Sequence, residues 1–395
     1  MDLEPDVLLQ KLIAIPSVNP MGRDVSGPEF YETRLTEYLC GMMDEAGILY
    51  EVQEVHPGRS NVIARLEGSP GAPTVLLDVH QDTVPVDGMT IPPFDPQVRD
   101  GKIYGRGASD VKGGMASMLS AFLKLNRDRP DGMATTILSL TCDEEATATG
   151  VAALADLWNM PNNGSQVLPS PPDVAVVAEP TMLDIVVAHR GATRFKLRTA
   201  GRACHSSRPQ DGISAIYRMA RVVMLLEEYA GKLADFFEPH PLCGPPTLSV
   251  GRIEGGSSIN VVPDWCQIEV DRRVIPGENH QTVLEHLTNY LTERLDFEIE
   301  IQPPYLNGPP LPDDNNGPLA EALMSQIEAV AGPHAKVGVP YGTHASRTAL
   351  GGVPSVVFGP GDIAQAHTKD EWIEIEQLKL AADVYYRFCA SGGAR

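Results

Sequence analysis

Five short segments place imidazoles and carboxylates where apolar strands or glycine-rich loops are predicted to end. The candidates are His80 and Asp82 in VLLDVHQDTVP, Asp110 in GRGASDVKGG, Asp143, Glu144 and Glu145 in LTCDEEATATG, Glu179 in VVAEP, and His367 in GPGDIAQAHTKDEW. Side chains at the carboxyl ends of strands in an α/β sheet point into the crevice where ligands bind. Each segment alone also fits a simpler interpretation, such as an exposed strand end, a helix N-cap or a solvated acidic loop.

Taken together, the five segments supply a set of metal ligands. The set contains two imidazoles and three carboxylates: His80, Asp110, Glu145, Glu179 and His367. If one carboxylate bridges, each of two Zn²⁺-like ions receives one histidine, one terminal carboxylate and the bridge, which leaves a position open for water. Glu144, next to a ligand, is then a natural general base. Asp82 shares a strand face with His80 and could orient its ring.

Other chemistries fit the chain less well. The glycines between 105 and 114 form neither a G-x-G-x-x-G fingerprint nor a P-loop, and no G-x-S-x-G nucleophile motif is present. Cys204 and His205 are adjacent, and adjacent side chains of a strand point to opposite faces, which argues against a thiol nucleophile activated by that histidine.

The predicted elements describe an α/β fold with an insertion. Helices are expected over 3–14, 29–46, 111–126 and 147–159, and strands over 48–55, 61–67, 74–80, 134–142 and 173–179. The pattern changes near 185 to strands at 184–189 and 192–200, a helix at 212–230, strands at 247–253 and 265–273, a helix at 279–294 and a strand at 296–301. We therefore expect a catalytic domain of residues 1–184 and 304–395, with a mixed, mostly parallel sheet flanked by helices, and an inserted α+β domain at 185–303.

Composition excludes several classes of protein. The 395 residues carry 31 Lys and Arg against 52 Asp and Glu, for a net charge of −21. This charge argues against nucleic acid and an anionic membrane surface as partners. The first residues lack the basic region of a signal peptide, and no apolar run is long enough to span a membrane. Six scattered cysteines without a C-x-x-C pair favour a cytoplasmic enzyme with reduced thiols.

The motifs in this order resemble the M20 family of di-zinc amidohydrolases and peptidases. The resemblance rests on His80-x-Asp82, Asp110-x-Lys112-Gly113-Gly114, Asp143-Glu144-Glu145, Glu179-Pro180 and Ala366-His367, and it runs through nearly the whole chain. Within the family, the segments GPGDIAQAHTKDEW and AEPT are most similar to the acetylornithine deacetylase and succinyl-diaminopimelate desuccinylase branch.

The resemblance implies a role for each matched residue. His80 and Glu179 would hold one zinc ion, Glu145 and His367 would hold the other, and Asp110 would bridge them; Co²⁺ or Mn²⁺ could substitute. Asp82 would orient His80, and Glu144 would be the base that activates water. The insertion would be a lid and dimerisation domain, so a homodimer is expected. Its His205 would complete the active site, often that of the neighbouring subunit, and Asn260 and Arg273 would bind the substrate carboxylate.

The expected function is hydrolysis of the amide bond of an N-acyl amino acid, as by an acetylornithine deacetylase of arginine biosynthesis. Alternatives are a succinyl-diaminopimelate desuccinylase, a glutamate-type carboxypeptidase, or a non-catalytic protein that contains metal and binds an acyl amino acid. One departure from the family bears on the substrate. His344 stands in Gly342-Thr343-His344-Ala345, where members often carry an acidic residue. An imidazole there would change the charge near the pocket.

Overall fold

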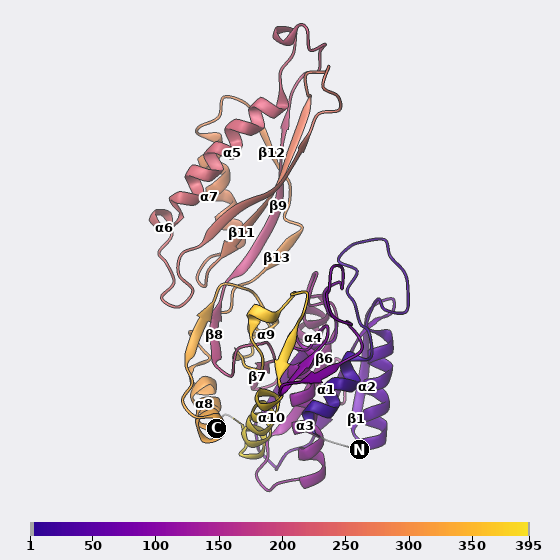
Figure 1. Cartoon of the computed structure of the whole chain (residues 1–395). Coiled ribbons are helices and arrows are strands. Elements are labelled where there is room, and N and C mark those ends of the chain that lie inside the picture. Colours follow the sequence, from indigo (N-terminus) through magenta and orange to yellow (C-terminus); the bar gives the residue numbers. More distant parts are fainter. Residues whose placement is uncertain (1–3, 394–395) are drawn as a thin grey trace. The chain divides into compact units, whose positions relative to one another are not determined.

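The computed structural model describes residues 4–393 and divides into two compact units (Figure 1). The large unit comprises Met1–Val187, Asp313–Val337 and Thr343–Arg395, and the small unit comprises Ala188–Pro312 and Gly338–Gly342. The small unit therefore begins and ends further along the chain than the insertion expected at 185–303. Residue 3, where the first helix was expected to begin, lies outside the described residues.

An eight-stranded mixed sheet forms the centre of the large unit. Its strands, in spatial order, are β1 (Leu49–His56), β2 (Arg59–Leu66), β6 (Thr135–Thr141), β3 (Thr74–His80), β7 (Val174–Val177), β15 (Ser355–Val357), β8 (Ile185–His189) and β14 (Lys336–Val339). The central strands β6, β3, β7 and β15 run parallel, whereas β1 and β2 add antiparallel pairs at one edge. This arrangement confirms the expected mixed α/β class.

Helices cover both faces of this sheet, which explains why its central strands are apolar throughout. They are α1 (Pro5–Ile13), α2 (Thr33–Ala46), α3 (Lys112–Asp128), α4 (Thr149–Asn159), α8 (Gly317–Ala331), α9 (Ala345–Leu350) and α10 (Ile375–Ala390). In β3, Val75, Leu77 and Val79 pack into the core formed with α1, α2, α3, α8 and α10. Leu76 packs on the opposite face with α4. Successive side chains of a strand alternate between faces, so Asp78 and His80 lie on the α4 face with Leu76.

The second helix is shorter than expected, beginning at Thr33 rather than near 29. Tyr31 has a φ of 64°, which is outside the right-handed helical region. A continuous helix cannot include Tyr31, so α2 begins after it.

The large unit also contains a three-stranded sheet that was not expected from the sequence. It contains β4 (Gln97–Arg99), β5 (Lys102–Tyr104) and β16 (Trp372–Glu374), in the order β16-β5-β4. Each strand has three residues, too few for an alternating pattern to stand out in the sequence. The sheet joins segments from opposite ends of the chain, because Trp372 pairs with Tyr104.

The small unit is an antiparallel sheet with two long helices packed on it (Figure 1). Its strands are β9 (Gly191–Ala200), β10 (Thr247–Gly255), β11 (Trp265–Val274), β12 (Ile299–Ile301) and β13 (Leu306–Gly308); its helices are α5 (Ala215–Gly231), α6 (Leu233–Phe236) and α7 (His280–Thr292). Alternate residues of β11, such as Cys266, Ile268 and Val270, are buried beneath these helices. The strand β10 is an edge of this sheet.

Among the described residues, no helix combines the length and the apolar character that a membrane span requires.

Candidate metal centre

Three parallel strands and two loops bring the predicted ligands of the large unit together. His80 is the last residue of β3, Glu145 follows β6, and Glu179 follows β7. Because β6, β3 and β7 are parallel neighbours, their carboxyl ends meet at one edge of the sheet. Asp110 lies in the loop between β5 and α3, and His367 lies in the loop between β15 and β16.

The five side chains form two groups that share Asp110. The ligand atoms of His80, Asp110 and Glu179 lie within 4.8 Å of one another, as do those of Asp110, Glu145 and His367. Asp110 Oδ1 is 3.3 Å from His80 Nε2, and Asp110 Oδ2 is 3.3 Å from His367 Nε2. The Asp110 carboxylate therefore presents one oxygen to each imidazole, as a bridging carboxylate would.

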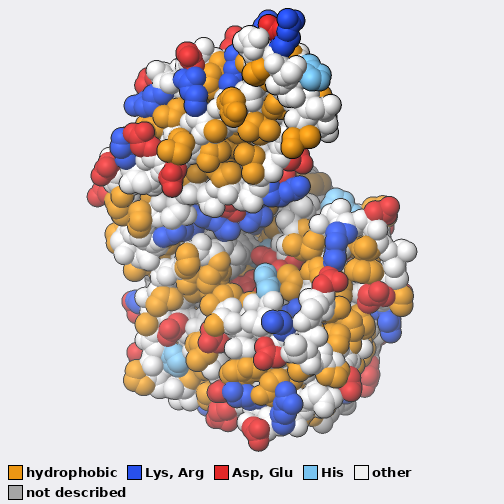
Figure 2. All heavy atoms as spheres, turned by 45° about the horizontal axis from the view of Figure 1, so that its top comes forward, with side chains coloured by type: hydrophobic (Ala, Val, Ile, Leu, Met, Phe, Trp, Pro, Cys, Tyr) orange, Lys and Arg blue, Asp and Glu red, His pale blue; other side chains and the backbone are white. Residues whose placement is uncertain are grey.

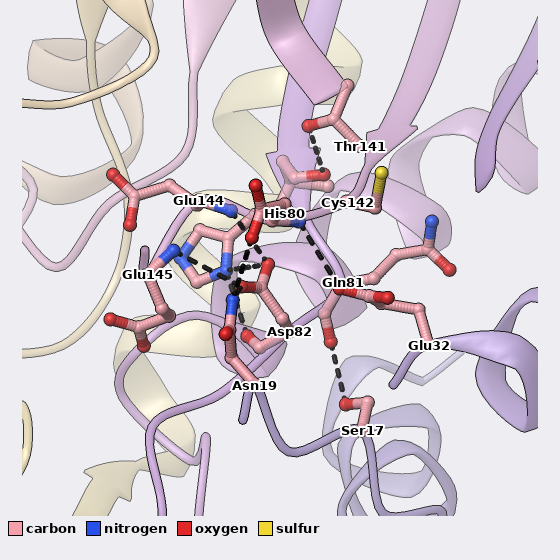
Figure 3. Close-up of polar contacts among 12 residues, drawn as sticks. Ser17, Asn19, Glu32, His80, Gln81, Asp82, Thr141, Cys142, Glu144 and Glu145 are labelled. Carbon is pink, nitrogen blue, oxygen red and sulfur yellow. Dashed lines mark hydrogen bonds and ion pairs between the residues drawn. The ribbon is translucent and has the colours of Figure 1, made fainter. Parts of the chain in front are cut away.

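Asp82 contacts the other nitrogen of the His80 ring. His80 Nδ1 lies 2.9 Å from the backbone oxygen of Asp82 and 3.5 Å from its Oδ1 (Figure 3). Since both of these partners are acceptors, Nδ1 carries a proton, and Nε2 is the ring nitrogen that faces Asp110 and Glu179. This arrangement is typical of a metal-binding histidine oriented by a neighbouring carboxylate or carbonyl.

Asp82 also holds the loop that carries Glu144 and Glu145. The backbone N–H of Glu144 donates to Asp82 Oδ1 at 3.0 Å, and that of Glu145 donates to Oδ2 at 3.1 Å. In Figure 3, the side chains of Glu144 and Glu145 extend to the same side of the His80 ring. Burial raises the pKa of the Glu144 carboxyl, while His80 and His344 lower it.

The acidic groups of this site are crowded in a way that favours a cation. Burial, followed by the charge of Asp110, raises the pKa of Glu145 to about 8 and that of Glu179 well above its usual range. Burial also opposes ionisation of Asp110, but its contacts with His367 and His80 hold its pKa below the usual range. Carboxylates packed this closely repel one another unless positive charge neutralises them. Figure 2 shows a group of acidic side chains next to a histidine on the face in view.

The donor set fits a pair of divalent metal ions. Two imidazoles and three carboxylates suit Zn²⁺ and related first-row ions. Two buried polar atoms of the set, His80 Nε2 and Glu145 Oε1, have no hydrogen-bond partner among the described residues. Buried polar atoms without partners are uncommon in folded proteins, and metal coordination would satisfy both of these.

A buried ionic network behind the site was not predicted from the sequence. Arg59, at the start of β2, contacts Glu32 through Nη2 and Oε1 at 2.5 Å and Asp143 through Nη1 and Oδ1 at 2.6 Å. Asn19 Nδ2 donates to both Asp82 Oδ2 at 2.7 Å and Asp143 Oδ1 at 3.1 Å (Figure 3). The network thus fixes Asp82 and the first residue of the Asp143-Glu144-Glu145 run together.

His344 is buried and belongs to the surroundings of the same site. Its Nδ1 lies 2.9 Å from Asp78 Oδ2, and its ring meets the His80 ring edge-on at a centroid distance of 6.1 Å. Asp78 Oδ1 accepts a hydrogen bond from Ser139 Oγ at 2.5 Å. The imidazole of His344 therefore does not stand alone beside the site, because it is paired with the carboxylate of Asp78.

The other predicted residues, His205, Asn260 and Arg273, belong to the small unit. Exposed His205 and Asn260 lie on adjacent segments, since the backbone N–H of Ser206 donates to the Asn260 oxygen at 3.0 Å. Arg273 lies near the far end of β11, where its Nε contacts Asp271 Oδ1 at 2.8 Å. At about 3.3 Å per residue, the eight steps from Trp265 to Arg273 separate the two ends of this strand by about 26 Å. Within one chain, Arg273 is therefore remote from His205 and Asn260.

Comparison with known proteins identifies the class of this fold and site. Residues 76–391 match the family described as Peptidase family M20/M25/M40. The chain is 32% identical over 398 residues to an acetylornithine deacetylase of Photorhabdus laumondii, with 97% of each chain covered. It is similar in fold to a tripeptidase of Staphylococcus aureus (TM-score 0.76, 22% identity, 98% of each chain). It is also similar to a dinuclear metal binding peptidase from the M20 family of Bacillus subtilis (TM-score 0.68, 18% identity, 98% of this chain and 96% of that chain).

The chain belongs to the M20/M25/M40 peptidase family, and it is a hydrolase of the amide-cleaving kind. The expected family resemblance is confirmed by this match. The alternative of a non-catalytic binding protein finds no support among these relatives.

Proposed function

We propose that this protein hydrolyses the amide bond of an N-acyl amino acid, with N-acetylornithine as the first substrate to test. The observation that carries the proposal is the Asp110 carboxylate, which presents one oxygen to His80 and the other to His367 at equal distances. Full-length similarity to an acetylornithine deacetylase supports the choice of acyl amino acid.

The metal centre would hold two ions, which we propose are Zn²⁺, with Co²⁺ or Mn²⁺ able to substitute. His80 and Glu179 would bind one ion, Glu145 and His367 the other, and Asp110 both. When bound, the ions would lower the pKa of water and polarise the acyl carbonyl. Asp82 would keep the Nε2 lone pair of His80 directed at its ion.

Glu144 is proposed as the general base and then the general acid. Its carboxylate would accept a proton from the attacking water, and the new C–O bond would form at the acyl carbon. Glu144 would then donate that proton to the amide nitrogen as the C–N bond breaks, giving a carboxylic acid and an amine. The carboxyl group is suited to both steps because burial raises its pKa toward the working range of an acid–base catalyst.

We assign the large unit as the catalytic domain and the small unit as a lid and dimerisation domain. His205 would stabilise negative charge that develops on the acyl oxygen, and Asn260 and Arg273 would bind the free carboxylate of the substrate. The distance along β11 between Arg273 and the His205–Asn260 pair supports a site to which two chains contribute. We therefore propose a homodimer in which His205 serves the site of its partner.

The edge strand β10 and the neighbouring helix α5 support this dimer. An edge strand presents unpaired backbone groups that can pair with a second copy. Tyr217 and Met224, seven residues apart and so on one face of α5, are 78% and 65% exposed. Ile253 on β10 is also exposed. The large exposed apolar side chains would be buried if two small units pair through these elements.

We place the enzyme in the cytoplasm. Every cysteine of the chain is free in this structure, which suits a compartment that keeps thiols reduced.

The first experiment is an assay of amine release after metal removal and restoration. The protein is treated with a chelator, dialysed, and given Zn²⁺ or Co²⁺ with N-acetylornithine, N-acetylmethionine, N-succinyl-diaminopimelate or a folyl-type glutamate. We expect release from N-acetylornithine that depends on the metal. Release from the succinyl or folyl substrate alone would instead identify a desuccinylase or a carboxypeptidase, and binding of no metal by the wild-type chain would overturn the site assignment.

A complementation experiment tests the shared site. Chains carrying Glu144→Ala and chains carrying His205→Ala are each expected to be inactive. Co-expressed, they would form mixed dimers in which one site has an intact Glu144 from one chain and an intact His205 from the other. Partial activity is therefore expected in the mixture. A mixture as inactive as its parents, in spite of mixed dimers isolated by two affinity tags, would place His205 in the site of its own chain.

The dimer surface is tested separately by light scattering with size-exclusion chromatography. Tyr217→Glu with Met224→Glu would place two charges on the proposed interface, and we expect the mass of a monomer. Met160→Glu, at an exposed apolar position of the large unit, is the matched control and should leave the mass unchanged. A wild-type chain that runs as a monomer would rule out the proposed assembly.

A further inference from the structure

The buried carboxylate of Glu371 lies inside the loop that carries Asp110. Glu371 is fully buried and comes four residues after His367, directly before β16. Because Trp372 pairs with Tyr104, the antiparallel register places Glu371 opposite Gly105, whose N–H donates to the Glu371 backbone oxygen at 3.1 Å. The β5–β16 pairing thereby directs the Glu371 side chain into the segment 105–110.

Four donors converge on this carboxylate. Glu371 Oε2 accepts from Gly107 N at 2.9 Å and from Arg106 Nη1 at 2.7 Å. Glu371 Oε1 accepts from Ser109 N at 2.8 Å and from Asp110 N at 2.9 Å. Three backbone N–H groups of one loop thus form an anion-binding nest, and Arg106 balances the buried negative charge.

The conformation of Gly107 makes this nest possible. Its φ is 81°, a region that side chains rarely adopt, and a Cβ at this position would lie 2.9 Å from Thr83 Cγ2. A residue other than glycine would strain the turn that aims the Gly107 N–H at Glu371.

From these contacts we infer that Glu371 is a positioning residue for the metal centre, which holds the bridging Asp110 in place and ties it to the loop of His367. The bond to Asp110 N fixes the backbone from which the bridging carboxylate extends. Only three residues separate Glu371 from His367, so the loop that carries His367 is anchored close to the same carboxylate. A hydrogen bond from Ser109 Oγ to the Asp362 oxygen, at 3.2 Å, joins the two loops at another point.

A glutamine at position 371 would keep the shape of the side chain but could not accept all four hydrogen bonds. Its amide has one acceptor oxygen, and its NH₂ group would face N–H donors where Oε1 or Oε2 now accepts two bonds. Depending on the orientation of the amide, either Ser109 N and Asp110 N or Gly107 N and Arg106 Nη1 would be left without an acceptor. In both cases the loop would be held less firmly, and Asp110 could shift from its position between the two imidazoles. Loss of such outer contacts typically weakens metal binding by about 10- to 100-fold.

The test compares Glu371→Gln with the wild-type chain and with Glu374→Gln, an exposed glutamate three residues further on. Each protein is stripped of metal and titrated with Zn²⁺ in competition with a chromophoric chelator. The absorbance of the Co²⁺-loaded protein is recorded as a second measure. We expect weaker Zn²⁺ binding and an altered Co²⁺ spectrum in Glu371→Gln only.

A purely structural role would give a different result. The thermal midpoint is measured for each protein without metal and with saturating Zn²⁺. A positioning role predicts that the rise in midpoint on adding Zn²⁺ is smaller in Glu371→Gln than in wild type. Equal Zn²⁺ affinity and an equal rise, with only the metal-free midpoint lowered, would overturn the inference.

A milder variant keeps the inference testable if Glu371→Gln does not fold. Arg106→Lys retains the positive charge but cannot reproduce the two bonds that Arg106 makes with Glu371 and with the Pro85 oxygen. We expect it to weaken Zn²⁺ binding in the same direction, and unchanged binding would contradict the inference. The inference rests on the proposed metal centre, and the wild-type titration separates the two. If the wild type binds no metal, the proposed function fails. If the wild type binds Zn²⁺ and the variants bind it equally tightly, the proposed function stands and the role of Glu371 fails.

Discussion

At the scale of single residues, the role proposed for Glu144 allows catalysis to be tested separately from metal binding. Its carboxylate is not among the two groups of metal ligands, although its neighbour Glu145 is. Glu144→Ala should therefore keep its metal and lose nearly all turnover, since general base catalysis is worth about 10²- to 10⁴-fold. The metal content and the rate of amine release are measured on the same preparation. A variant that retains a tenth of the wild-type rate would refute the assignment of Glu144 as the base.

Arg59 makes a second prediction at this scale, one of stability. Arg59→Met would leave Glu32 and Asp143 buried without a cationic partner, and breaking such a pair costs about 3–5 kcal/mol. Arg59→Lys should cost less, because it keeps the charge while losing the forked contact. Denaturant unfolding of the metal-free proteins measures both. Equal stability of the methionine variant and the wild type would contradict the importance of this network.

The candidate metal ligands could be proposed from the sequence more readily than the residues that hold them in place. His80, Asp110, Glu145, Glu179 and His367 each lie in a recognisable local motif, so their types and order carried the prediction of a metal site. Arg59 lies in a segment with no such motif. Glu371 belongs to the segment that carries His367, but neither its type nor its spacing predicts a role for it. Arg59 and Glu371 act through contacts with Asp143, 84 residues away, and with Asp110, 261 residues away. Only the folded chain brings these pairs together.

At the scale of elements, the packing of α5 against α7 predicts an alkaline transition. Tyr229 on α5 is fully buried, and its hydroxyl lies 2.9 Å from His286 Nδ1 on α7. Burial raises the pKa of Tyr229 to about 12, against 10.0 in an unfolded chain. At a pH between these two pKa values, the unfolded chain has lost the phenolic proton of Tyr229 and the folded chain retains it. Stability present below pH 10 is therefore lost as the pH rises to about 12.

The size of this effect follows from the two pKa values. A difference of two units corresponds to about 2–3 kcal/mol at most. Tyr229→Phe removes the group that titrates, so its unfolding free energy should fall less steeply above pH 10 than that of the wild type. Urea unfolding from pH 8 to pH 11.5 measures the two slopes. Parallel slopes would show that Tyr229 does not contribute to the alkaline loss.

The long elements were predictable from the sequence and the short ones were not. Strands β3 and β6 and helix α3 have apolar patterns of seven residues or more, and the structure places them close to the expected ranges. Strands β4, β5 and β16 have three residues each and exist through their pairing with one another. Their register nevertheless decides where Glu371 points, so the least predictable sheet has a direct bearing on the site.

At the scale of the whole molecule, the negative charge is distributed unequally. The small unit has 13 Lys and Arg against 15 Asp and Glu, so nearly all of the net charge of −21 belongs to the large unit. Like charges on one compact body repel one another, and salt screens this repulsion. We expect the thermal midpoint to rise when NaCl is increased from about 10 mM to about 150 mM, across which the screening length shortens from about 30 Å to about 8 Å.

The salt experiment is carried out with a chelator present, so that contaminating divalent ions do not contribute. Each 1 kcal/mol of relief would raise the midpoint by about 1 °C, because an unfolding entropy of about 2.1 cal/mol/K per residue amounts to about 0.8 kcal/mol/K for 395 residues. Sucrose at matched osmolality is the uncharged control. A midpoint that falls with added NaCl would mean that attractive ion pairs, such as the Arg59 network, outweigh the repulsion.

The order of the ligands along the chain has a consequence for biosynthesis. His80, Asp110, Glu145 and Glu179 all precede the small unit, whereas His367 and Glu371 follow it. A ribosome that has passed Val187 has synthesised the first imidazole and all three acidic candidate ligands. It has not yet synthesised the second imidazole or the carboxylate that secures Asp110. The proposed two-ion centre is completed only after this later segment has been synthesised and β16 has paired with β5. Nascent chains that stop before His367 would therefore lack the proposed hydrolytic centre, and its assembly would report that the two separate stretches of the large unit have come together.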